Sequence, residues 1–574
     1  MFNKSQLYAL ERYYNALNGY KWGYPADKES IPWNFSTSNP NPCTPIKWNG
    51  LSCDRNNDSI VNIEMRDFSG VSGQIPYDLF VNLTSIRIFS VSGDIIGSIP
   101  SSFDYIKNLE ILDIEATGKL TGSIPPSLMS HTELKVLSIS GGLEGSIPSS
   151  LVNMTKLETL SLSDCRLSGK IPSFLGSLTK LKILVLSTGL QGTIPDALMN
   201  LHQLELLVLS PNSLTGSIPS TIGLLTSLKA FSLWANFYLS GTIPPSICSL
   251  TNLNTLQLSV NPLIEGPIPA DIGNLSKLEI LRLHGMGLNG TLPESLCDLT
   301  NLKTLHLFDN KFTGHLLPCI TNMVSLFDVE VYNNGFTGPI PDFDPLNVGA
   351  FIAYHNQLSG TIPASLLAMS TLQVVYLDGN LLTGTIPSTA KLINLRTFSV
   401  YDNQLYGDIV FENSPQLKYL VLENNSFSGS LQSIANCENL QHLLLQGNQF
   451  SGELPDFFWT YAQLSVLDIT GNRFTGSLPT DLFGKLAAIQ NFYIGSNLFT
   501  GPLPAINMSS TIKQVDFSDN YFEGTLTDEN FIATNIDSVS YAVNCLDVKL
   551  PVDICDSPAT TLILSGLHTI SKLQ

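Results

Sequence analysis

A short motif recurs along most of this 574-residue chain: a glycine, one variable residue, an aliphatic residue and, usually, a proline. The first of these glycines is Gly73, the last is Gly524, and successive ones are 22 to 25 residues apart. Most intervals follow the pattern L-x-x-L-x-L-x-x-N-x-L-x-G-x-I-P, and a degenerate copy at 536–546 follows the last glycine. A fixed period of this size indicates a solenoid, because one unit cannot bury its own leucines and must stack on its neighbours.

The spacing of the leucines predicts the secondary structure of each repeat. In L-x-x-L-x-L the leucines point inward on a short strand and the residues between them point outward. The glycine and proline then turn the chain back along the opposite side. We therefore expect an α/β repeat fold, a curved or superhelical solenoid with a parallel concave sheet and short helical or 3-10 convex segments.

The asparagine of the pattern predicts a second ladder, because a buried amide satisfies backbone groups that water cannot reach. The first six repeats have other residues at this position, among them Cys165, which we interpret as a small buried substitute. We expect these six repeats to be less regular and more mobile. The asparagine is present in most later repeats: Asn212, Asn236, Asn261, Asn310, Asn334, Asn356, Asn380, Asn403, Asn425, Asn448, Asn472, Asn497, Asn520 and Asn544.

Composition excludes several classes of function. Charged residues make up only 13% of the chain and the formal net charge is −19, which does not suit nucleic acid or an anionic membrane surface. No apolar run is long enough to span a membrane, and the first residues lack the continuous apolar stretch of a signal peptide. Motifs for phosphate cradling, a serine nucleophile or a zinc protease are absent, so we expect neither an enzyme nor a cofactor.

The unit L-x-G-x-I-P in a repeat of about 24 residues resembles the plant-type leucine-rich repeats of receptor-like kinases, receptor-like proteins and polygalacturonase inhibitors. Similar repeats occur in amoebozoan proteins. The segment "PCTPIKWNGLSC" at 42–53 resembles the N-terminal cap of that family, with three extra residues between its cysteines. The resemblance implies a cap at 1–58 with an amphipathic helix, about twenty-one repeats at 59–546, and a C-terminal cap with the start of a tail at 547–574.

The resemblance also implies a disulfide between Cys43 and Cys53 and another between Cys545 and Cys555. Cys297 and Cys319 occupy nearly equivalent positions in neighbouring repeats, and they are either a third bridge or two buried thiols. Candidate glycosylation sites, valid only for a secreted chain, are about as many as chance predicts: Asn34, Asn57, Asn82, Asn153, Asn274, Asn289, Asn424 and Asn507.

The family implies recognition of an extracellular partner. We expect a cell-surface, receptor-like ectodomain that binds a peptide, protein or glycan on its concave face and takes part in signalling. A secreted inhibitor of a carbohydrate-degrading enzyme and an intracellular scaffold are the alternatives.

Aligned repeats place aromatic, histidine and charged residues together at the outward strand positions of the central repeats. Large side chains concentrated on one face are typical of a recognition surface, although they also pack across a sheet for stability. His284, His306, Asp328 and Glu330 come from three consecutive repeats, but we interpret them as scattered polar residues and expect no metal. The expected ligand-binding residues are Trp234, Arg282, His284, His306, Phe308, Glu330, Tyr332, Tyr354, Tyr376 and Tyr401.

Overall fold

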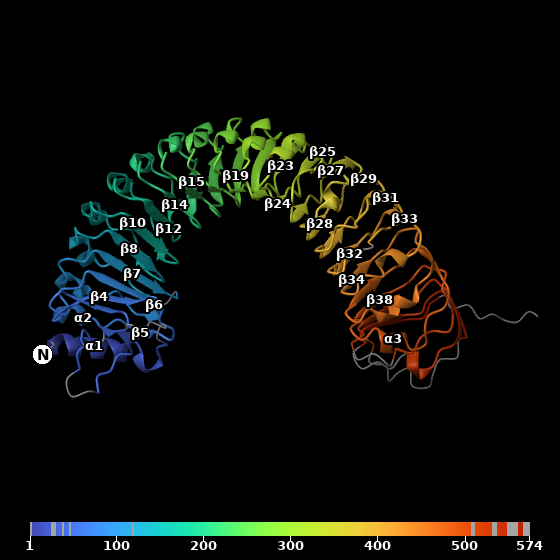
Figure 1. The fold of residues 1–574 in the computed structure, drawn as a ribbon, viewed down its shortest axis with the longest axis horizontal. Coiled ribbons are helices and arrows are strands. Elements are labelled where there is room, and N and C mark those ends of the chain that lie inside the picture. The colour runs from blue at the N-terminus through green and yellow to red at the C-terminus, as the bar shows by residue number, and fades with distance from the viewer. Residues whose placement is uncertain are drawn as a thin grey trace, which may run out of the picture. The chain divides into compact units, whose positions relative to one another are not determined.

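A computed structural model describes most of the chain: residues 3–23, 30–36, 40–44, 47–117, 120–411, 413–506, 511–530, 536–547, 559 and 561–565. The chain divides into two compact units, Met1–Asn289 and Gly290–Gln574, here called unit 1 and unit 2. Within each unit, the strands of one long parallel ladder lie on the inner side of the curve and the 3-10 helices on the other (Figure 1). We call this the main ladder.

The main ladder of unit 1 begins at the N-terminal cap. Its first strand pairs antiparallel with β3 (Leu51–Cys53), and every later neighbour is parallel. The strands are β4 (Ile60–Met65), β6 (Ile88–Ile96), β7 (Ile111–Ala116), β8 (Val136–Ser140), β10 (Thr159–Ser163), β12 (Ile183–Ser187), β14 (Leu206–Val208), β16 (Ala230–Ser232), β18 (Thr255–Gln257) and β20 (Ile280–Arg282).

In unit 2 the described main-ladder strands are all three residues long and parallel. They are β22 (Thr304–His306), β24 (Asp328–Glu330), β26 (Ala350–Ile352), β28 (Val374–Tyr376), β30 (Thr397–Ser399), β32 (Tyr419–Val421), β34 (His442–Leu444), β36 (Val466–Asp468), β38 (Asn491–Tyr493), β40 (Gln514–Asp516), β42 (Ser538–Ser540) and β44 (Thr561–Ile563).

A second set of short strands follows the ladder asparagine position in each unit. In unit 1 these are β5 (Ser72–Gln74), β9 (Glu144–Gly145), β11 (Arg166–Leu167), β13 (Gln191–Gly192), β15 (Ser213–Gly216), β17 (Tyr238–Gly241), β19 (Asn261–Gly266) and β21 (Met286–Gly290), which reaches the end of the unit. In unit 2 they are β23 (Lys311–His315), β25 (Gly335–Pro339), β27 (Gln357–Gly360), β29 (Leu381–Gly384), β31 (Gln404–Gly407), β33 (Ser426–Phe427), β35 (Ser451–Glu453), β37 (Arg473–Thr475), β39 (Thr500–Gly501), β41 (Tyr521–Thr525) and β43 (Cys545–Asp547).

Short helices close most repeats, and the motif explains where they start. Gly314 has a φ of +77°, a left-handed value that favours glycine, and Pro148 has a φ of −69° immediately before a 3-10 helix. The helices of unit 1 are α2 (Leu79–Asn82), η2 (Ser101–Tyr105), η3 (Pro126–Ser130), η4 (Ser149–Asn153), η5 (Ser173–Ser177), η6 (Asp196–Asn200), η7 (Ile222–Leu224), η8 (Pro245–Ser249) and η9 (Ile272–Asn274). Those of unit 2 are η10 (Glu294–Asp298), η11 (Pro318–Asn322), η12 (Leu366–Ala368), η13 (Gln432–Ile434), η14 (Asp456–Thr460), α3 (Leu482–Lys485) and η16 (Asp528–Asn530).

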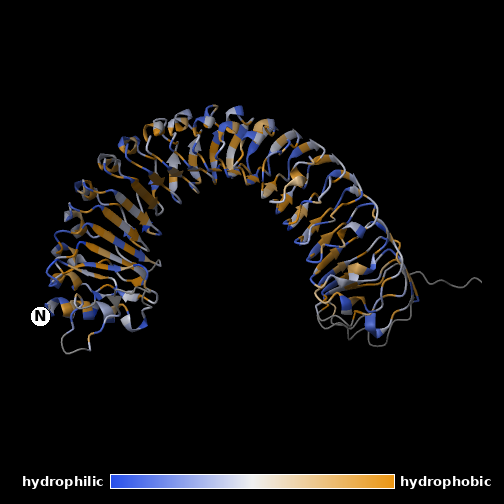
Figure 2. Cartoon of the chain, in the orientation of Figure 1, coloured by the Kyte–Doolittle hydropathy of each residue, from blue (hydrophilic) through white to orange (hydrophobic). Residues whose placement is uncertain are grey.

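Along the strands of each unit, apolar residues alternate with more polar ones (Figure 2), and the buried apolar residues form the core. Parallel register places the inward residues in continuous columns. In unit 2, for example, Leu305 lies opposite Val329, Val329 opposite Phe351 and Phe351 opposite Val375, and all four are buried. The predicted parallel repeat sheet is confirmed.

The asparagine ladder is present at all fourteen predicted positions, and Asn380 shows the pattern. Its Nδ2 donates to the carbonyls of Ala353 and Leu377, at 3.1 and 3.0 Å, and its Oδ1 accepts from the backbone N–H of Leu358 at 3.0 Å. One buried amide thus joins the backbones of two neighbouring repeats.

The first six repeats, which lack the asparagine, differ from the later ones in a way that the sequence did not predict. The strands β6 and β7, from such repeats, have 9 and 6 residues, whereas β14, β16 and the main-ladder strands that follow them have 3. Without an amide to take over the backbone groups, hydrogen bonding between strands continues further along the repeat. Cys165 occupies the ladder position as expected: it is buried, its thiol donates to the carbonyl of Ser163, and burial raises the pKa of the thiol to about 11. The greater mobility of these repeats stays a prediction.

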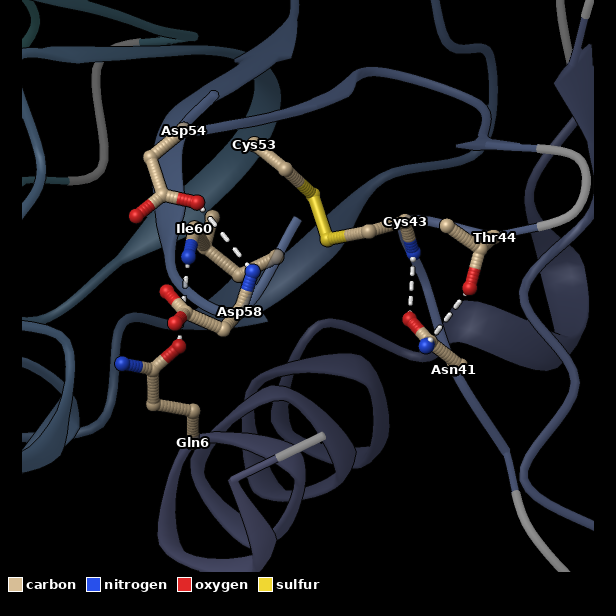
Figure 3. Close-up of a disulfide and its surroundings, with 8 residues drawn as sticks. All are labelled: Gln6, Asn41, Cys43, Thr44, Cys53, Asp54, Asp58 and Ile60. Atoms are coloured by element: carbon tan, nitrogen blue, oxygen red, sulfur yellow. Dashed lines mark hydrogen bonds between the residues drawn. A yellow bond between two sulfur atoms is a disulfide. The ribbon is translucent and has the colours of Figure 1, made fainter. Parts of the chain in front are cut away.

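The N-terminal cap contains the helix α1 (Lys4–Ala16), the short helix η1 (Gly19–Lys21) and the strands β1 (Ser30–Ile31) and β2 (Lys47–Trp48). The bond between Cys43 and Cys53 is present, and Gln6 of α1 accepts a hydrogen bond from the backbone of Ile60 at 3.2 Å, which ties the helix to the first ladder strand (Figure 3). The helix buries Tyr13 completely, whereas Tyr14 is half-buried.

Of the two interpretations for the central cysteines, the bridge is correct. Cys297 and Cys319 form a disulfide with a Cα–Cα distance of 5.8 Å, inside the normal range. It joins two adjacent 3-10 helices, η10 and η11, because the two cysteines occupy nearly equivalent positions in successive repeats. Cys555 lies outside the described residues, so its pairing with Cys545 stays a prediction.

Candidate functional site

A histidine and two carboxylates form a compact cluster at the start of unit 2. His306 and Glu330 are directly opposite each other on β22 and β24, and Asp328 is on the same face of β24 as Glu330 because the two are two residues apart. The Nε2 of His306 is 2.8 Å from Asp328 Oδ2 and 3.7 Å from Glu330 Oε1. The side chain of His306 is only 11% exposed. The sequence predicted an exposed residue here, but the two carboxylates and the neighbouring Phe308 ring cover the imidazole.

Aromatic side chains continue from this cluster along the same face. We call Phe308, Tyr332, Tyr354, Tyr376 and Tyr401 the aromatic strip. The rings of Phe308, Tyr332 and Tyr354 are stacked, with both centroid distances at 4.3 Å and interplanar angles of 10° and 13°. This spacing follows the separation of neighbouring strands, about 4.8 Å.

All members of the aromatic strip are half-buried, and the stacked rings of Phe308, Tyr332 and Tyr354 cover one another. Each stacked pair contributes roughly 0.5–1.5 kcal/mol beyond its buried area. The predicted packing of these rings across the ladder is therefore real, and their outer edges still face the solvent.

The turns after the strands add polar groups to the expected ligand-binding residues. Asp309, Asn333 and His355 are exposed and have φ values of 53°, 51° and 50°. Asn333 Nδ2 donates to Asp309 Oδ1 at 2.7 Å, His355 Nδ1 lies 3.0 Å from Asn333 Oδ1, and the hydroxyl of Tyr401 is 3.4 Å from His355 Nε2. The sequence contains a signal that could have identified these residues. Each stands immediately before a ladder asparagine, and Asp, Asn and His tolerate the left-handed backbone conformation.

A shallow hollow of about 430 Å³ lies beside the aromatic strip. Its lining combines apolar, aromatic and ionisable groups: Glu330, Tyr332, Ile352, Tyr354, His355, Tyr376, Asp378 and Tyr401. The hollow is large enough for one or two side chains of a ligand, and the face continues on both sides of it.

Two carboxyl groups at and beyond the hollow hold their protons unusually strongly. Burial raises the pKa of Asp378 to about 6, although hydrogen bonds from the Ser399 hydroxyl and the Tyr401 backbone act in the opposite direction. Burial, followed by the nearby carboxylates Asp468, Asp378 and Asp402, raises the pKa of Glu423 to about 7. A cation bound here would compensate for carboxylates that are poorly solvated.

The expected ligand-binding residues are therefore divided between the two units. His306, Phe308, Glu330, Tyr332, Tyr354, Tyr376 and Tyr401 lie together on the face of unit 2. Trp234, which is 39% exposed, Arg282 and His284 belong to unit 1 and form no part of the hollow. Of the candidate glycosylation residues, Asn507 lies outside the described residues, the other seven are exposed, and whether any is modified stays a prediction.

Comparison with known proteins places the repeats in a family. A model described as "Leucine-rich repeat region" matches residues 189–382, and a model described as "Leucine Rich Repeat" matches 156–178, 439–461 and 463–484. The chain is similar to receptor-like protein 35 of Arabidopsis thaliana, with 27% identity over 244 residues, 38% of this chain and 23% of the relative. It is also similar to receptor like protein 23 of the same plant, with 32% identity over 194 residues, 33% of this chain and 21% of the relative.

The chain is a plant-type leucine-rich-repeat protein. Its fold matches that of the receptor kinase HAESA of Arabidopsis, solved in complex with the peptide hormone IDA and a co-receptor, with a TM-score of 0.81 and 29% identity over 100% of this chain and 99% of that one. The plant peptide hormone receptor RGFR1, solved in complex with RGF2, gives a TM-score of 0.75 and 28% identity over 90% of this chain and 83% of that one.

This leucine-rich-repeat protein spans about a quarter of the length of the curated relatives that it matches. Among the residues that the structure describes, no helix combines the length and the apolar character needed to cross a membrane.

Proposed function

We propose that this chain is the ligand-recognition part of an extracellular, receptor-like protein, and that the face of unit 2 binds an extended peptide. The observation that carries the proposal is the aromatic strip. Three of its rings are stacked, and two of those three, Tyr332 and Tyr354, line the hollow. Stacked rings are already immobilised before a ligand arrives, so binding against their edges costs little conformational entropy. The similarity to peptide-hormone receptor ectodomains over nearly the whole chain supports the same function.

The distribution of groups along the face favours one kind of peptide. Apolar side chains of the ligand would pack against Tyr332, Tyr354 and Tyr376. A basic side chain would lie near Asp378 and Glu423, whose ionisation costs free energy in the absence of a cation. The regular spacing of the strands suits an extended chain that crosses several repeats. The disulfides Cys43–Cys53 and Cys297–Cys319 support an oxidising, extracellular location.

The test uses peptides selected from a displayed random library against the purified chain. The selected peptides are titrated against a triple variant, Phe308→Ala, Tyr332→Ala and Tyr354→Ala. The matched control replaces Tyr406 and Tyr521 by alanine, because these tyrosines are 54% and 55% exposed in the same unit and lie outside the strip. Loss of an aromatic anchor typically costs about 2 kcal/mol or more, so we expect the triple variant to bind at least about thirtyfold more weakly.

Equal binding by the triple variant and the wild type would contradict the proposal. Thermal unfolding of the triple variant and the control tests whether the strip has a purely structural role. In that case the triple variant would melt at a lower temperature, but its peptide affinity below that temperature would be unchanged. If the triple variant does not fold, Tyr332→Leu keeps apolar packing, and the proposal still requires weaker peptide binding.

A further inference from the structure

We propose that His306, Asp328 and Glu330 form a zinc-binding site on the face of unit 2. The repeat pattern alone does not distinguish these residues from scattered polar groups. The structure distinguishes them: one nitrogen and two carboxylate oxygens, one from each residue, all lie within 4.8 Å of one another.

The parallel ladder explains why three ligands converge. His306 and Glu330 are register partners on adjacent strands, and Asp328 points to the same side as Glu330 because two residues separate them on one strand. The three side chains therefore start from rigid positions of the main ladder rather than from a loop. A site on regular strands keeps its geometry more accurately than a site on loops.

The distances suit a small ion. Zinc bonds to imidazole nitrogen and carboxylate oxygen are about 2.0–2.2 Å long, so ligands around a tetrahedral ion lie about 3.3 Å apart. The observed separations, 2.8 Å from His306 Nε2 to Asp328 Oδ2 and 3.7 Å to Glu330 Oε1, bracket that value. Small rotations of the two carboxylates would admit the ion and replace the direct hydrogen bond between His306 and Asp328.

Charge and ligand chemistry favour zinc over calcium or magnesium. A neutral imidazole with two ionised carboxylates carries a formal charge of −2, which a divalent cation neutralises. Calcium and magnesium prefer a shell made only of oxygen ligands, whereas an imidazole nitrogen favours zinc and its transition-metal neighbours. The exposed fractions of 11%, 30% and 21% for His306, Asp328 and Glu330 show that the group is partly shielded from water but accessible.

Three protein ligands leave a fourth position of a tetrahedral ion for water or for a donor atom of a ligand. Glu330 also lines the hollow beside the aromatic strip, so that position lies next to the surface proposed to bind a peptide. The zinc site itself does not depend on peptide binding, because its ligands belong to the chain alone.

The test is calorimetric titration of chelator-treated protein with zinc, in the absence of any peptide. We expect one zinc ion per chain, with no comparable binding of Mg²⁺ or Ca²⁺, and weaker binding as the pH is lowered because protons compete for the ligands. The single substitutions His306→Gln and Glu330→Gln should each weaken zinc binding by at least about a hundredfold. Loss of a direct ligand should cost more than loss of a residue that only hydrogen-bonds to a ligand. His442→Gln is the matched control, since His442 is on the main-ladder strand β34 of the same unit.

Cobalt gives a second readout, because Co²⁺ in the site would produce a visible absorption band that disappears in the His306→Gln variant. Failure of the wild type to bind zinc with a 1:1 ratio would overturn the inference. The inference would also be overturned if the His306→Gln and Glu330→Gln variants both bound zinc with unchanged affinity, since the ion would then be held by other residues. The strip triple variant distinguishes the two proposals, because it should lose peptide binding and keep zinc.

Discussion

Asp378 offers a test of whether the face of unit 2 carries charge at a cost to stability. Asp378 is 4% exposed, and its carboxyl accepts hydrogen bonds from the Ser399 hydroxyl and, at 2.9 Å, from the Tyr401 backbone. Burial nevertheless dominates and raises the pKa of Asp378 to about 6. An ordinary aspartate has a pKa near 4, and each pH unit of difference corresponds to about 1.4 kcal/mol, so ionisation of Asp378 costs the folded state about 3 kcal/mol.

The direction of the pH dependence of stability follows from whether the folded or the unfolded state holds the proton more tightly. The folded state binds the proton of Asp378 up to about pH 6, whereas the unfolded state releases it near pH 4. The contribution of this group to the free energy of unfolding is therefore fully present below about pH 4 and is lost as the pH rises to about 6. Above that pH the contribution stays constant and unfavourable.

The substitution Asp378→Asn removes the titration and keeps an oxygen that accepts both hydrogen bonds. We expect the variant and the wild type to unfold at similar temperatures near pH 4. At pH 7.5 the variant should be more stable, by up to about 3 kcal/mol. Thermal unfolding between pH 4 and pH 8 measures the difference, and comparison with the exposed Asp298→Asn removes general effects of the net charge of −19.

A variant that is less stable than the wild type at pH 7.5, by the same amount as at pH 4, would refute this reasoning. It would mean that the ionised carboxylate is well compensated in the folded state. If the expected gain is found, the natural residue is kept at a cost to stability, as expected for a group that meets a cation of a ligand.

Three other predictions concern the scaffold. Asn380→Ala should lower the free energy of unfolding by about 1–3 kcal/mol, because it leaves buried backbone groups without partners, whereas Asn394→Ala at an exposed amide should have little effect in the same denaturation assay. Replacement of Cys297 and Cys319 by serine should lower the melting temperature, because the 22-residue loop loses its cross-link; an unchanged melting temperature under oxidising conditions would count against this. Hydrogen exchange should be faster in the first six repeats, which lack a ladder asparagine, than in the later ones, and equal protection would contradict the expected mobility.

The sequence predicted the fold almost completely, because a repeat fold depends on contacts between neighbouring copies of one short pattern. The positions of Leu305 and Asn380 in that pattern determine their burial and their hydrogen bonds. The sequence did not predict the long strand β6. The effect of a missing ladder asparagine appears only when the backbone of the next repeat is in place. The sequence also left the cysteine pair Cys297 and Cys319 undecided, since equivalent positions do not fix the direction of the Cβ atoms.

For the site, the sequence by itself determined which residues face outward on the strands, because the side-chain direction alternates with a period of two. That rule placed His306, Phe308, Glu330 and Tyr332 on one face without any tertiary information. Only the tertiary structure decided which of them touch: the register of β22 against β24 brings His306 within bonding distance of two carboxylates, and the strand spacing stacks the rings. Burial and pKa also depend on what neighbouring repeats contribute, so the raised pKa of Asp378 is a property of the assembled ladder and not of the pattern.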